Sequence, residues 1–465
     1  MHAIYALKQV RPSMSFIKST IRDLSYLMPN YGGQIPFIIT GSSGPFITGK
    51  TQQTAPTEAR VCFNAGYSSA TIGYNPNWVQ AIVTNAHEKM LPMHVSRAYP
   101  YPELDALAEK LSTLTDPTIH NSRFGQVQLC PCLGGSDAVE AALKIALKHG
   151  YEKGIPDGNQ EIIFLKDPFH GRSRTVIGTG KDVAMHEGFS AQNQNFKECP
   201  INDTQTLKQL INKNTAGVIV EPVQGEPGIY EVSTDFARAL RESCNSVNAL
   251  LIADEVQTGF YRTGRHCFAS SLIGLKPDII VVAKALGGMV PMAGVLAREK
   301  ISSTFSPGTH GSTYAGNALS CQIALENLKQ YENITLGDAM QTIGDEIKHL
   351  FTEHQLHIPD MIDVRGPGAM IGIEMASKNT ADELVNHLFN AGADLGLRIT
   401  PDMLTSSNNM FNFNQLLDTP LAGISLKTTQ QGRVLRITPP YLTNAQLNAC
   451  LTMLDHALRK MKISK

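Results

Sequence analysis

The sequence predicts an α/β fold in which a mostly parallel sheet is covered by helices on both faces. The first observation is that short β-branched runs alternate with longer helical patterns through the middle of the chain. The runs are EIIFL (161–165), AGVIV (216–220), ALLIA (249–253) and DIIVVA (278–283). The second observation is that a polar or charged side chain follows the end of each run. Both are typical of such a sheet with a ligand site at its edge.

These four side chains are His170, Glu221, Asp254 and Lys284. His170 lies a few residues beyond its run, and the other three follow theirs directly. Ligands of open parallel sheets bind outside the carboxyl ends of the strands. We therefore expect the four side chains to form a single site.

The two ends of the chain differ in pattern from the middle. Residues 76–334 are predicted to form the large domain, and residues 1–75 and 335–465, which mix short strands with helices such as ADELVNHLFNAG, a smaller one. A Ser-, Asn- and Thr-rich stretch at about 399–432 indicates a loop or an insertion. Residues 1–22 carry four basic side chains and no acid, which fits either a transit peptide or an amphipathic segment packed on the body or on a partner chain.

Composition excludes several classes of protein. The 465 residues include 40 basic and 41 acidic side chains, so no net positive field attracts nucleic acid. No apolar stretch is long enough to span a bilayer, and we expect a cytoplasmic protein with reduced cysteines. Among the 8 cysteines only Cys130 and Cys132 are close in sequence. A single C-x-C pair does not match a zinc-site spacing, so no metal is expected.

Lys284 and Asp254 have the chemistry of a cofactor site. Burial at a strand end makes a lysine amine a nucleophile toward aldehydes, so Lys284 is a candidate Schiff-base lysine; a lysine that extends its charge to solvent is the alternative. A buried carboxylate such as Asp254 needs a partner, and a protonated pyridine nitrogen is one. Capping of the following helix is the alternative for Asp254.

The segment CLGGSDAVEAALKIALKHG (132–150) predicts a glycine-rich turn followed by a helix with Ser136 as its cap. Free amides and the helix dipole at such a start bind phosphate, although many helices begin with Gly-Ser for capping alone. HGSTYAGN (310–317) adds a second group of small hydroxyl donors, among them Thr313, and could also be an ordinary turn.

Three further motifs place side chains near this expected site. In DPFHGRS (167–173), Phe169 could stack on a flat cofactor or simply pack in the core. In EPVQGEPG (221–228), Glu221 and Glu226 lie in a rigid turn, where they could also be solvated loop acids. Arg436 lies in the strand-like run GRVLRITPP (432–440), which suits a guanidinium that grips a carboxylate.

Together these motifs resemble the class III aminotransferases, which depend on pyridoxal phosphate. The resemblance covers nearly the whole chain, and its most specific segments are IADEVQTGFYRTGR (252–265) and PDIIVVAKALGG (277–288). It implies fold type I, with a seven-stranded sheet, and a homodimer with shared active sites. It also implies catalysis by Lys284 and Asp254. The cofactor-binding residues that it implies are Gly135, Ser136, Phe169, His170, Asp254, Val256, Gln257, Lys284, Ser312 and Thr313.

Within the class, the segments at 30–39, 65–76 and 90–105 are most similar to ornithine aminotransferases. The reaction implied moves the δ-amino group of ornithine to 2-oxoglutarate, and Glu226 is expected to pair with Arg436 and mask it until the oxo acid binds. The substrate-binding residues implied are Tyr31, Tyr67, Arg172, Glu221, Glu226 and Arg436.

The chain departs from the family pattern at Leu133-Gly134, where a polar residue usually precedes the phosphate-loop glycine, and at Gly73-Tyr74, where the family has Gly-His. Several alternatives stay open. These are acetylornithine aminotransferase, 4-aminobutyrate aminotransferase, an aminomutase acting on glutamate semialdehyde, and a non-catalytic protein that kept the fold.

Overall fold

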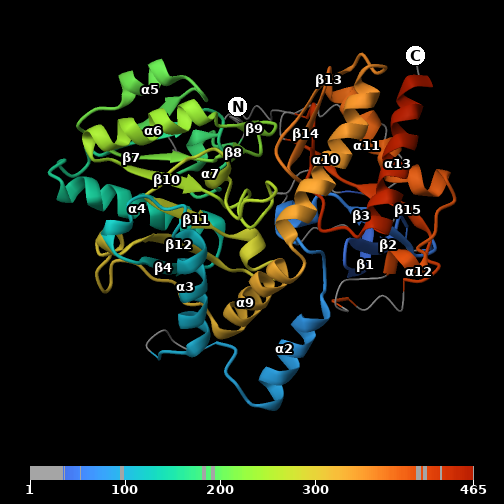
Figure 1. The fold of residues 1–465 in the computed structure, drawn as a ribbon, viewed down its shortest axis with the longest axis horizontal. Helices are drawn as coiled ribbons and strands as arrows, with labels where there is room; N and C mark the ends of the chain where they lie inside the picture. Colours follow the sequence, from blue (N-terminus) through green and yellow to red (C-terminus); the bar gives the residue numbers. More distant parts are fainter. Residues whose placement is uncertain are drawn as a thin grey trace, which may run out of the picture.

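The computed structural model describes residues 35, 37–52, 54–94, 99–180, 185–189, 194–404, 410–411, 416–429 and 432–463. Tyr31 and the basic segment 1–22 therefore lie outside the described residues. Figure 1 shows the middle of the chain on one side of the molecule and the two ends of the chain together on the other.

The central sheet has seven strands and is mostly parallel, which confirms the predicted fold class. Four strands coincide with the predicted apolar runs to within one or two residues, and only β12 runs against its neighbours β11 and β4. In spatial order the strands are β4 (Val127–Cys132), β12 (Ala293–Arg298), β11 (Ile279–Val282), β10 (Leu250–Asp254), β7 (Thr215–Val220), β5 (Glu161–Leu165) and β6 (Phe196–Cys199).

Alternate residues of these strands enter two separate cores, one on each face of the sheet. In β5, Ile163 packs into the first core and Ile162 into the second. Helix α4 (Gly135–Glu152) covers the second core, and α3 (Pro102–Thr115), α6 (Thr234–Val247) and α9 (Ala318–Asn333) contribute to the first. The side-chain period of two in a strand requires this arrangement when both faces are covered.

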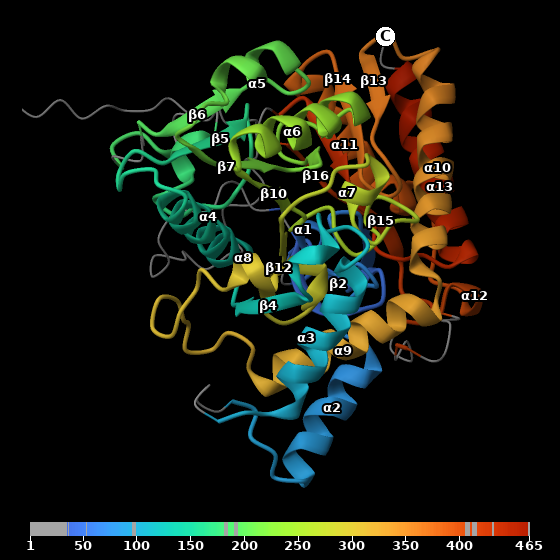
Figure 2. The ribbon, with the colours of Figure 1, turned by 60° about the vertical axis from the view of Figure 1, so that its left-hand side comes forward.

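The two ends of the chain share a sheet. In order, its strands are β1 (Ile38–Ser43), β2 (Phe46–Lys50), β3 (Glu58–Cys62) and β15 (Leu421–Ser425), and β15 pairs in parallel with β3. The stretch 399–432 is thus not entirely the loop or insertion that its composition indicated, because the apolar run at 421–425 fills an edge of this sheet. Figure 2 shows β2, in blue, and β15, in orange, in the same part of the molecule, where β3 lies between them in the sheet.

A second four-stranded sheet belongs to the C-terminal part. Its order is β13 (Met361–Arg365), β14 (Ile371–Met375), β17 (Val434–Ile437) and β16 (Lys427–Thr428). The helices of this part of the chain are α10 (Leu336–Gln355), α11 (Lys378–Asp394), α12 (Pro401–Leu404) and α13 (Asn444–Ile463). Arg436 lies in β17, in the strand that the sequence predicts.

The remaining elements are short, except for α2. They are α1 (Ala65–Ser68), α2 (Asn77–Glu88), α5 (Thr204–Leu210), α7 (Ala269–Leu272), α8 (Glu299–Ser302), the hairpin of β8 (Val223–Gln224) and β9 (Tyr230–Glu231), and the 3₁₀ turns at Ser122–Phe124, Ile177–Thr179 and Lys284–Leu286. Helix α2 extends away from the sheets (Figure 1). None of the described helices is long and apolar enough to cross a membrane.

Candidate active site

A cavity of about 450 Å³ lies at the carboxyl ends of β5, β7, β10 and β11. Its volume is in the range of small-molecule and cofactor sites. Nine of the residues implied by the sequence line it, together with others from the same segments. The lining comprises Ser69, Leu133, Gly134, Gly135, Ser136, Val139, Phe169, His170, Gly171, Glu221, Asp254, Val256, Gln257, Ala283, Lys284 and residues 288–292.

Asp254 and His170 form a buried pair in the cavity wall. Asp254 is the last residue of β10, and its Oδ2 lies 2.8 Å from His170 Nδ1. Burial disfavours the charged imidazole, but the hydrogen bond to Asp254 and the charge of Asp254 raise the pKa of His170. The other carboxylate oxygen accepts a hydrogen bond from the Val256 amide at 3.1 Å. Asp254 is thereby held in one orientation toward the cavity.

Glu221 is a second buried carboxyl group in the same wall. It follows β7 directly and is only 5% exposed. Its Oε2 accepts a hydrogen bond from the Phe169 amide at 3.0 Å, which fixes the loop that carries Phe169 and His170. Burial is the main reason that the pKa of Glu221 rises to about 7, with a further contribution from the negative charge of Asp254.

Lys284 begins the 3₁₀ turn after β11 and lines the cavity from the same strand end as Ala283. Its φ of 44° lies in the left-handed region, which is uncommon for a lysine and points to a conformation imposed by the site. Burial, followed by the positive charge of Arg436, lowers the pKa of Lys284 to about 8. The amine is therefore easily deprotonated and nucleophilic near neutral pH.

The start of α4 forms a cradle for an anionic group. The helix begins at Gly135, with Gly134 in extended conformation as its N-cap, so the prediction that Ser136 caps it is wrong. Asp137 reaches back instead, and its Oδ2 accepts a hydrogen bond from the Leu133 amide at 2.9 Å. The Ser136 hydroxyl oxygen is left to accept a bond from the Arg172 amide at 3.3 Å.

This cradle fits a phosphate group. A Cβ atom at Gly134 would meet nothing within 4 Å, so open space adjoins the helix start. A Cβ at Gly135 would come within 3.0 Å of Val256, so a larger residue would crowd the cavity. Backbone amides at a helix N-terminus, together with the dipole, favour an anion at this point.

Two apolar side chains and one amide complete the space above the cradle. Val256 and Phe169 line the cavity from different strand ends, as expected for residues that hold a flat ring between them. Gln257 also lines it, and its Nε2 donates to the Ser68 hydroxyl at 3.4 Å. The residues present therefore fit a planar, phosphate-bearing pyridine with an acid beside its nitrogen.

Arg436 and Glu226 form an ion pair next to this cavity. Both are largely buried, and the ring of Tyr67 lies over the guanidinium, 5.6 Å from its central carbon. The charges of both groups act on the Lys284 amine. An arginine that can hold a substrate carboxylate is therefore present, and an acid of the same chain neutralises it.

Other residues implied by the sequence do not line the cavity. The side chain of Arg172 is exposed and lies 6.0 Å from the Phe169 ring centroid. Ser312 is half-buried and Thr313 exposed, in the loop before α9. Tyr31 is outside the described residues. The single chain thus brings together the residues at the strand ends, while Ser312 and Thr313 are not part of the cavity lining.

Three groups of residues in or next to the cavity wall were not predicted from the sequence. Residues 288–292 follow Lys284 within the same apolar segment, so their position next to the lysine was a usable signal. Ser69 is near Tyr67 in sequence, and Ser68 contacts Gln257, but their serine-rich segment has no distinctive spacing. Glu255 lies below the site, where Ser270 and Thr258 donate hydrogen bonds to its carboxylate. It supports the segment that carries Asp254 and Val256.

Comparison with known proteins agrees with this geometry. The model of the family "Aminotransferase class-III" matches residues 29–458. An acetylornithine aminotransferase of Clostridium acetobutylicum is 34% identical over 373 residues, which cover 79% of this chain and 90% of that protein. Ornithine aminotransferase 2 of Staphylococcus aureus is 35% identical over 314 residues, 67% of this chain and 76% of that protein.

The fold is similar to that of a solved ornithine aminotransferase from Toxoplasma gondii, with a TM-score of 0.80 and 26% identity over 95% of this chain and 94% of the other. Aminotransferases of this class use pyridoxal phosphate, and the acid, lysine and anion cradle of the cavity suit that group. The chain therefore belongs to the class III aminotransferases and is a transaminase.

Proposed function

We propose that this transaminase moves the δ-amino group of ornithine to 2-oxoglutarate, giving glutamate semialdehyde and glutamate. The observation that supports this proposal most directly is the ion pair of Arg436 with Glu226 beside Lys284. While Glu226 neutralises the guanidinium, Arg436 does not draw the α-carboxylate of ornithine toward the reacting amine. Release of Glu226 frees the arginine for a carboxylate of 2-oxoglutarate.

Pyridoxal phosphate, when bound, supplies an electron-withdrawing ring that stabilises negative charge on the carbon that loses a proton. Gly135 and Ser136, which line the cavity at the start of α4, would hold the phosphate. Asp254, oriented by His170, would keep the ring nitrogen protonated. Val256 and Phe169 would hold the ring between them, and Gln257 would bind its hydroxyl group.

Lys284 would hold the cofactor through its amine before the donor arrives. Once free, the amine would take up the proton that leaves the donor carbon and supply it again on the cofactor side. Its pKa of about 8 suits both tasks, because a proton-transfer group works best with a pKa near the working pH. Arg172 is proposed to grip the α-carboxylate, with Tyr67, Tyr31 and Glu221 around the donor.

We further propose a cytoplasmic homodimer. The exposure of Thr313 and the absence of Ser312 and Thr313 from the lining of their own cavity support it, because a second copy could use them to hold a phosphate. None of the eight cysteines, all within the described residues, forms a disulfide, which is in keeping with a reducing compartment.

Acetylornithine is the second candidate donor, since the Clostridium relative carries that name. The deciding experiment offers the holoenzyme L-ornithine, N-acetyl-L-ornithine or 4-aminobutyrate, with and without 2-oxoglutarate. We expect a pyrroline product from ornithine, formed only with the oxo acid. A higher kcat/KM for N-acetylornithine would replace the proposed donor, and turnover of added glutamate semialdehyde without 2-oxoglutarate would indicate an aminomutase.

Lys284→Ala is the control for the chemistry in that experiment. We expect it to lower turnover at least about 1000-fold, because it removes both the amine that holds the cofactor and the proton carrier. Lys329→Ala, at an exposed position of α9, should keep full activity. Activity retained by Lys284→Ala would overturn the assignment of the lysine.

A further inference from the structure

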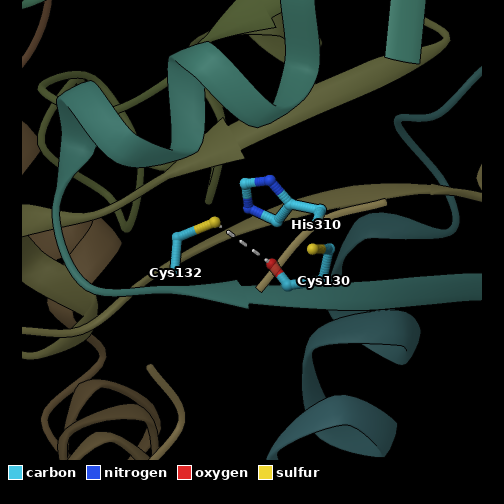
Figure 3. Close-up of side chains that lie close together, drawn as sticks. All are labelled: Cys130, Cys132 and His310. Atoms are coloured by element: carbon cyan, nitrogen blue, oxygen red, sulfur yellow. Dashed lines mark hydrogen bonds between the residues drawn. The ribbon is translucent and has the colours of Figure 1, made fainter. Parts of the chain in front are cut away.

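Three potential metal ligands lie together outside the cavity. They are the thiols of Cys130 and Cys132 on β4 and the imidazole of His310, and their ligand atoms all lie within 4.8 Å of one another. Figure 3 shows both sulfur atoms on the side of the strand that faces the imidazole. Cys132 is buried, and the other two are half-buried.

The local structure explains how these residues meet. Side chains two apart on a strand point to the same face, so the C-x-C spacing directs both thiols toward α4. His310 comes from the loop 303–317, and its ring stacks on Phe305 with the centroids 5.3 Å apart and the planes at 13°. The ring position is therefore set by packing rather than by the sequence spacing of the ligands.

Two thiols and an imidazole form a ligand set that zinc prefers over calcium or magnesium. In a tetrahedral zinc site the ligand atoms are separated by about 3.4 to 3.8 Å, because the bonds are about 2.0 to 2.3 Å long. From within 4.8 Å, shifts of roughly 1 Å complete that geometry. Small side-chain rotations supply such a shift without moving the strand.

The ammonium group of Lys144 lies near one ring nitrogen of His310 and bears on which nitrogen could bind a metal ion. Its Nζ lies 3.3 Å from His310 Nδ1 and donates to the Thr309 carbonyl oxygen at 2.6 Å. A ring nitrogen that binds a metal ion leaves the proton on the other nitrogen, which cannot then accept a bond from an ammonium group. With a metal on Nε2, the ammonium would turn from the ring and keep the Thr309 carbonyl.

We propose that Cys130, Cys132 and His310 bind one Zn²⁺ ion, with water as the fourth ligand. Binding releases the two thiol protons, so the ion and the two thiolates balance in charge. The ion links the loop 303–317 to β4, the strand that leads into the cradle at Gly135. This site is independent of the proposed donor and of turnover.

The experiment is a titration of the holoenzyme with Co²⁺, which reports tetrahedral thiolate ligation by its d–d bands in the red, outside the absorption of the cofactor. We expect one Co²⁺ per chain, displaced by one equivalent of Zn²⁺. Cys130→Ser and His310→Gln should each weaken binding at least ~10-fold, since loss even of an outer partner costs that much. Both positions are half-buried, so the fold tolerates these changes better than a change at Cys132.

Cys267→Ser is the matched control, because this half-buried cysteine lies outside the cluster. It should bind cobalt as the unaltered chain does. Hydrogen exchange in residues 303–317 should slow on addition of zinc to the unaltered chain, but not to His310→Gln. Absent d–d bands, or equal affinity in all four proteins, would overturn the site, and neither result depends on which amino donor the enzyme uses.

Discussion

At the residue scale, Glu221 and Glu226 both lie near Lys284 and are only five positions apart, but their surroundings differ. Glu221 is buried against the loop of Phe169 and has few ways to share its charge. Glu226 shares its charge with Arg436 at the edge of the cavity. We therefore expect Glu226 to affect the choice of amino group and Glu221 to affect the pH dependence of stability.

Glu226→Ala should lower the preference for the δ-amino over the α-amino group at least about tenfold, a change of about 1.4 kcal/mol. With Glu226 removed, Arg436 keeps an uncompensated charge that attracts the α-carboxylate of ornithine into the cavity. The measurement is the ratio of kcat/KM for the two amino groups. Glu231→Ala, an exposed acid beyond the same turn, is the control, and an unchanged ratio in Glu226→Ala would rule out the masking role.

Glu221→Gln should stabilise the cofactor-free protein above pH 7. The folded chain keeps a proton on Glu221 up to about pH 7, whereas the unfolded chain loses it near pH 4.5. Between these values the unfolded state binds fewer protons, so this group lowers stability as the pH rises. The loss of unfolding free energy that Glu221 causes amounts to about 3 kcal/mol above pH 7 and vanishes below pH 4.5.

Urea unfolding of both proteins from pH 4 to pH 8 measures this effect. The glutamine oxygen can still accept the bond from the Phe169 amide, so the loop contact is retained. We expect the curves of free energy against pH to diverge between pH 4.5 and 7. Parallel curves would mean that Glu221 titrates at its ordinary pKa.

At the element scale, the start of α4 and the loop of residues 168–172 fit together closely. Gly171 has a φ of 119°, and a Cβ there would lie 2.2 Å from the Ser136 hydroxyl oxygen. Gly154 has a similar φ of 100°, but a Cβ there would meet nothing within 4 Å. A comparison of alanine substitutions at these two positions therefore separates the effect of backbone strain from the effect of steric contact.

Gly171→Ala should destabilise the fold by about 2 to 4 kcal/mol and weaken cofactor binding, because the loop must move away from the phosphate cradle. Gly154→Ala should cost about 1 to 2 kcal/mol and leave cofactor affinity unchanged. Thermal unfolding and a cofactor titration followed by absorbance measure the two quantities. Equal cofactor affinity in the two variants would contradict the proposed contact.

The sequence predicted the elements best where burial alone determines them. The runs at 161–165 and 216–220 became strands because all their residues except Glu161, at the start of the first run, are apolar or small, and both faces of the sheet are covered. The capping role predicted for Ser136 was wrong because Asp137, one position later, accepts the hydrogen bond from the Leu133 amide at the start of the helix. Residues 421–425 were obscured by the polar stretches on both sides of them.

The candidate site was predictable to the extent that strand ends converge. Asp254 and Lys284 end or follow neighbouring strands, so the parallel pairing of β10 with β11 brings them together. His310 gave no such signal, because a loop and the stacking on Phe305 place it beside β4. Contacts that depend on loop packing have no regular spacing in the sequence.

At the scale of the whole molecule, the segment between α2 and α3 carries an exposed group of large apolar side chains. Met90 is 90% exposed, and Leu91, Met93 and Tyr99 are also exposed. Figure 1 shows α2, which leads into this segment, extending beyond the body of the molecule. Clusters of this kind indicate a protein interface.

Met90→Glu combined with Leu91→Glu should convert the proposed homodimer into a monomer of 50.6 kDa. Two buried charges without partners cost several kcal/mol at an interface. Sedimentation velocity measures the mass. Leu356→Glu, at a position that is 83% exposed beyond the end of α10, is the control and should leave the assembly unchanged. A double variant that still sediments as a dimer would place the interface elsewhere.

The pairing of β15 with β3 has a consequence for the order in which the protein can fold during its synthesis. The strands β1–β3 leave the ribosome early, but the strand that closes their edge is made some 360 residues later. Until then β3 offers an open row of backbone donors and acceptors to any other chain nearby. The large sheet can form meanwhile, since all its strands lie between residues 127 and 298. The nascent chain therefore keeps an unpaired, aggregation-prone edge at β3 until the strand β15 has been synthesised.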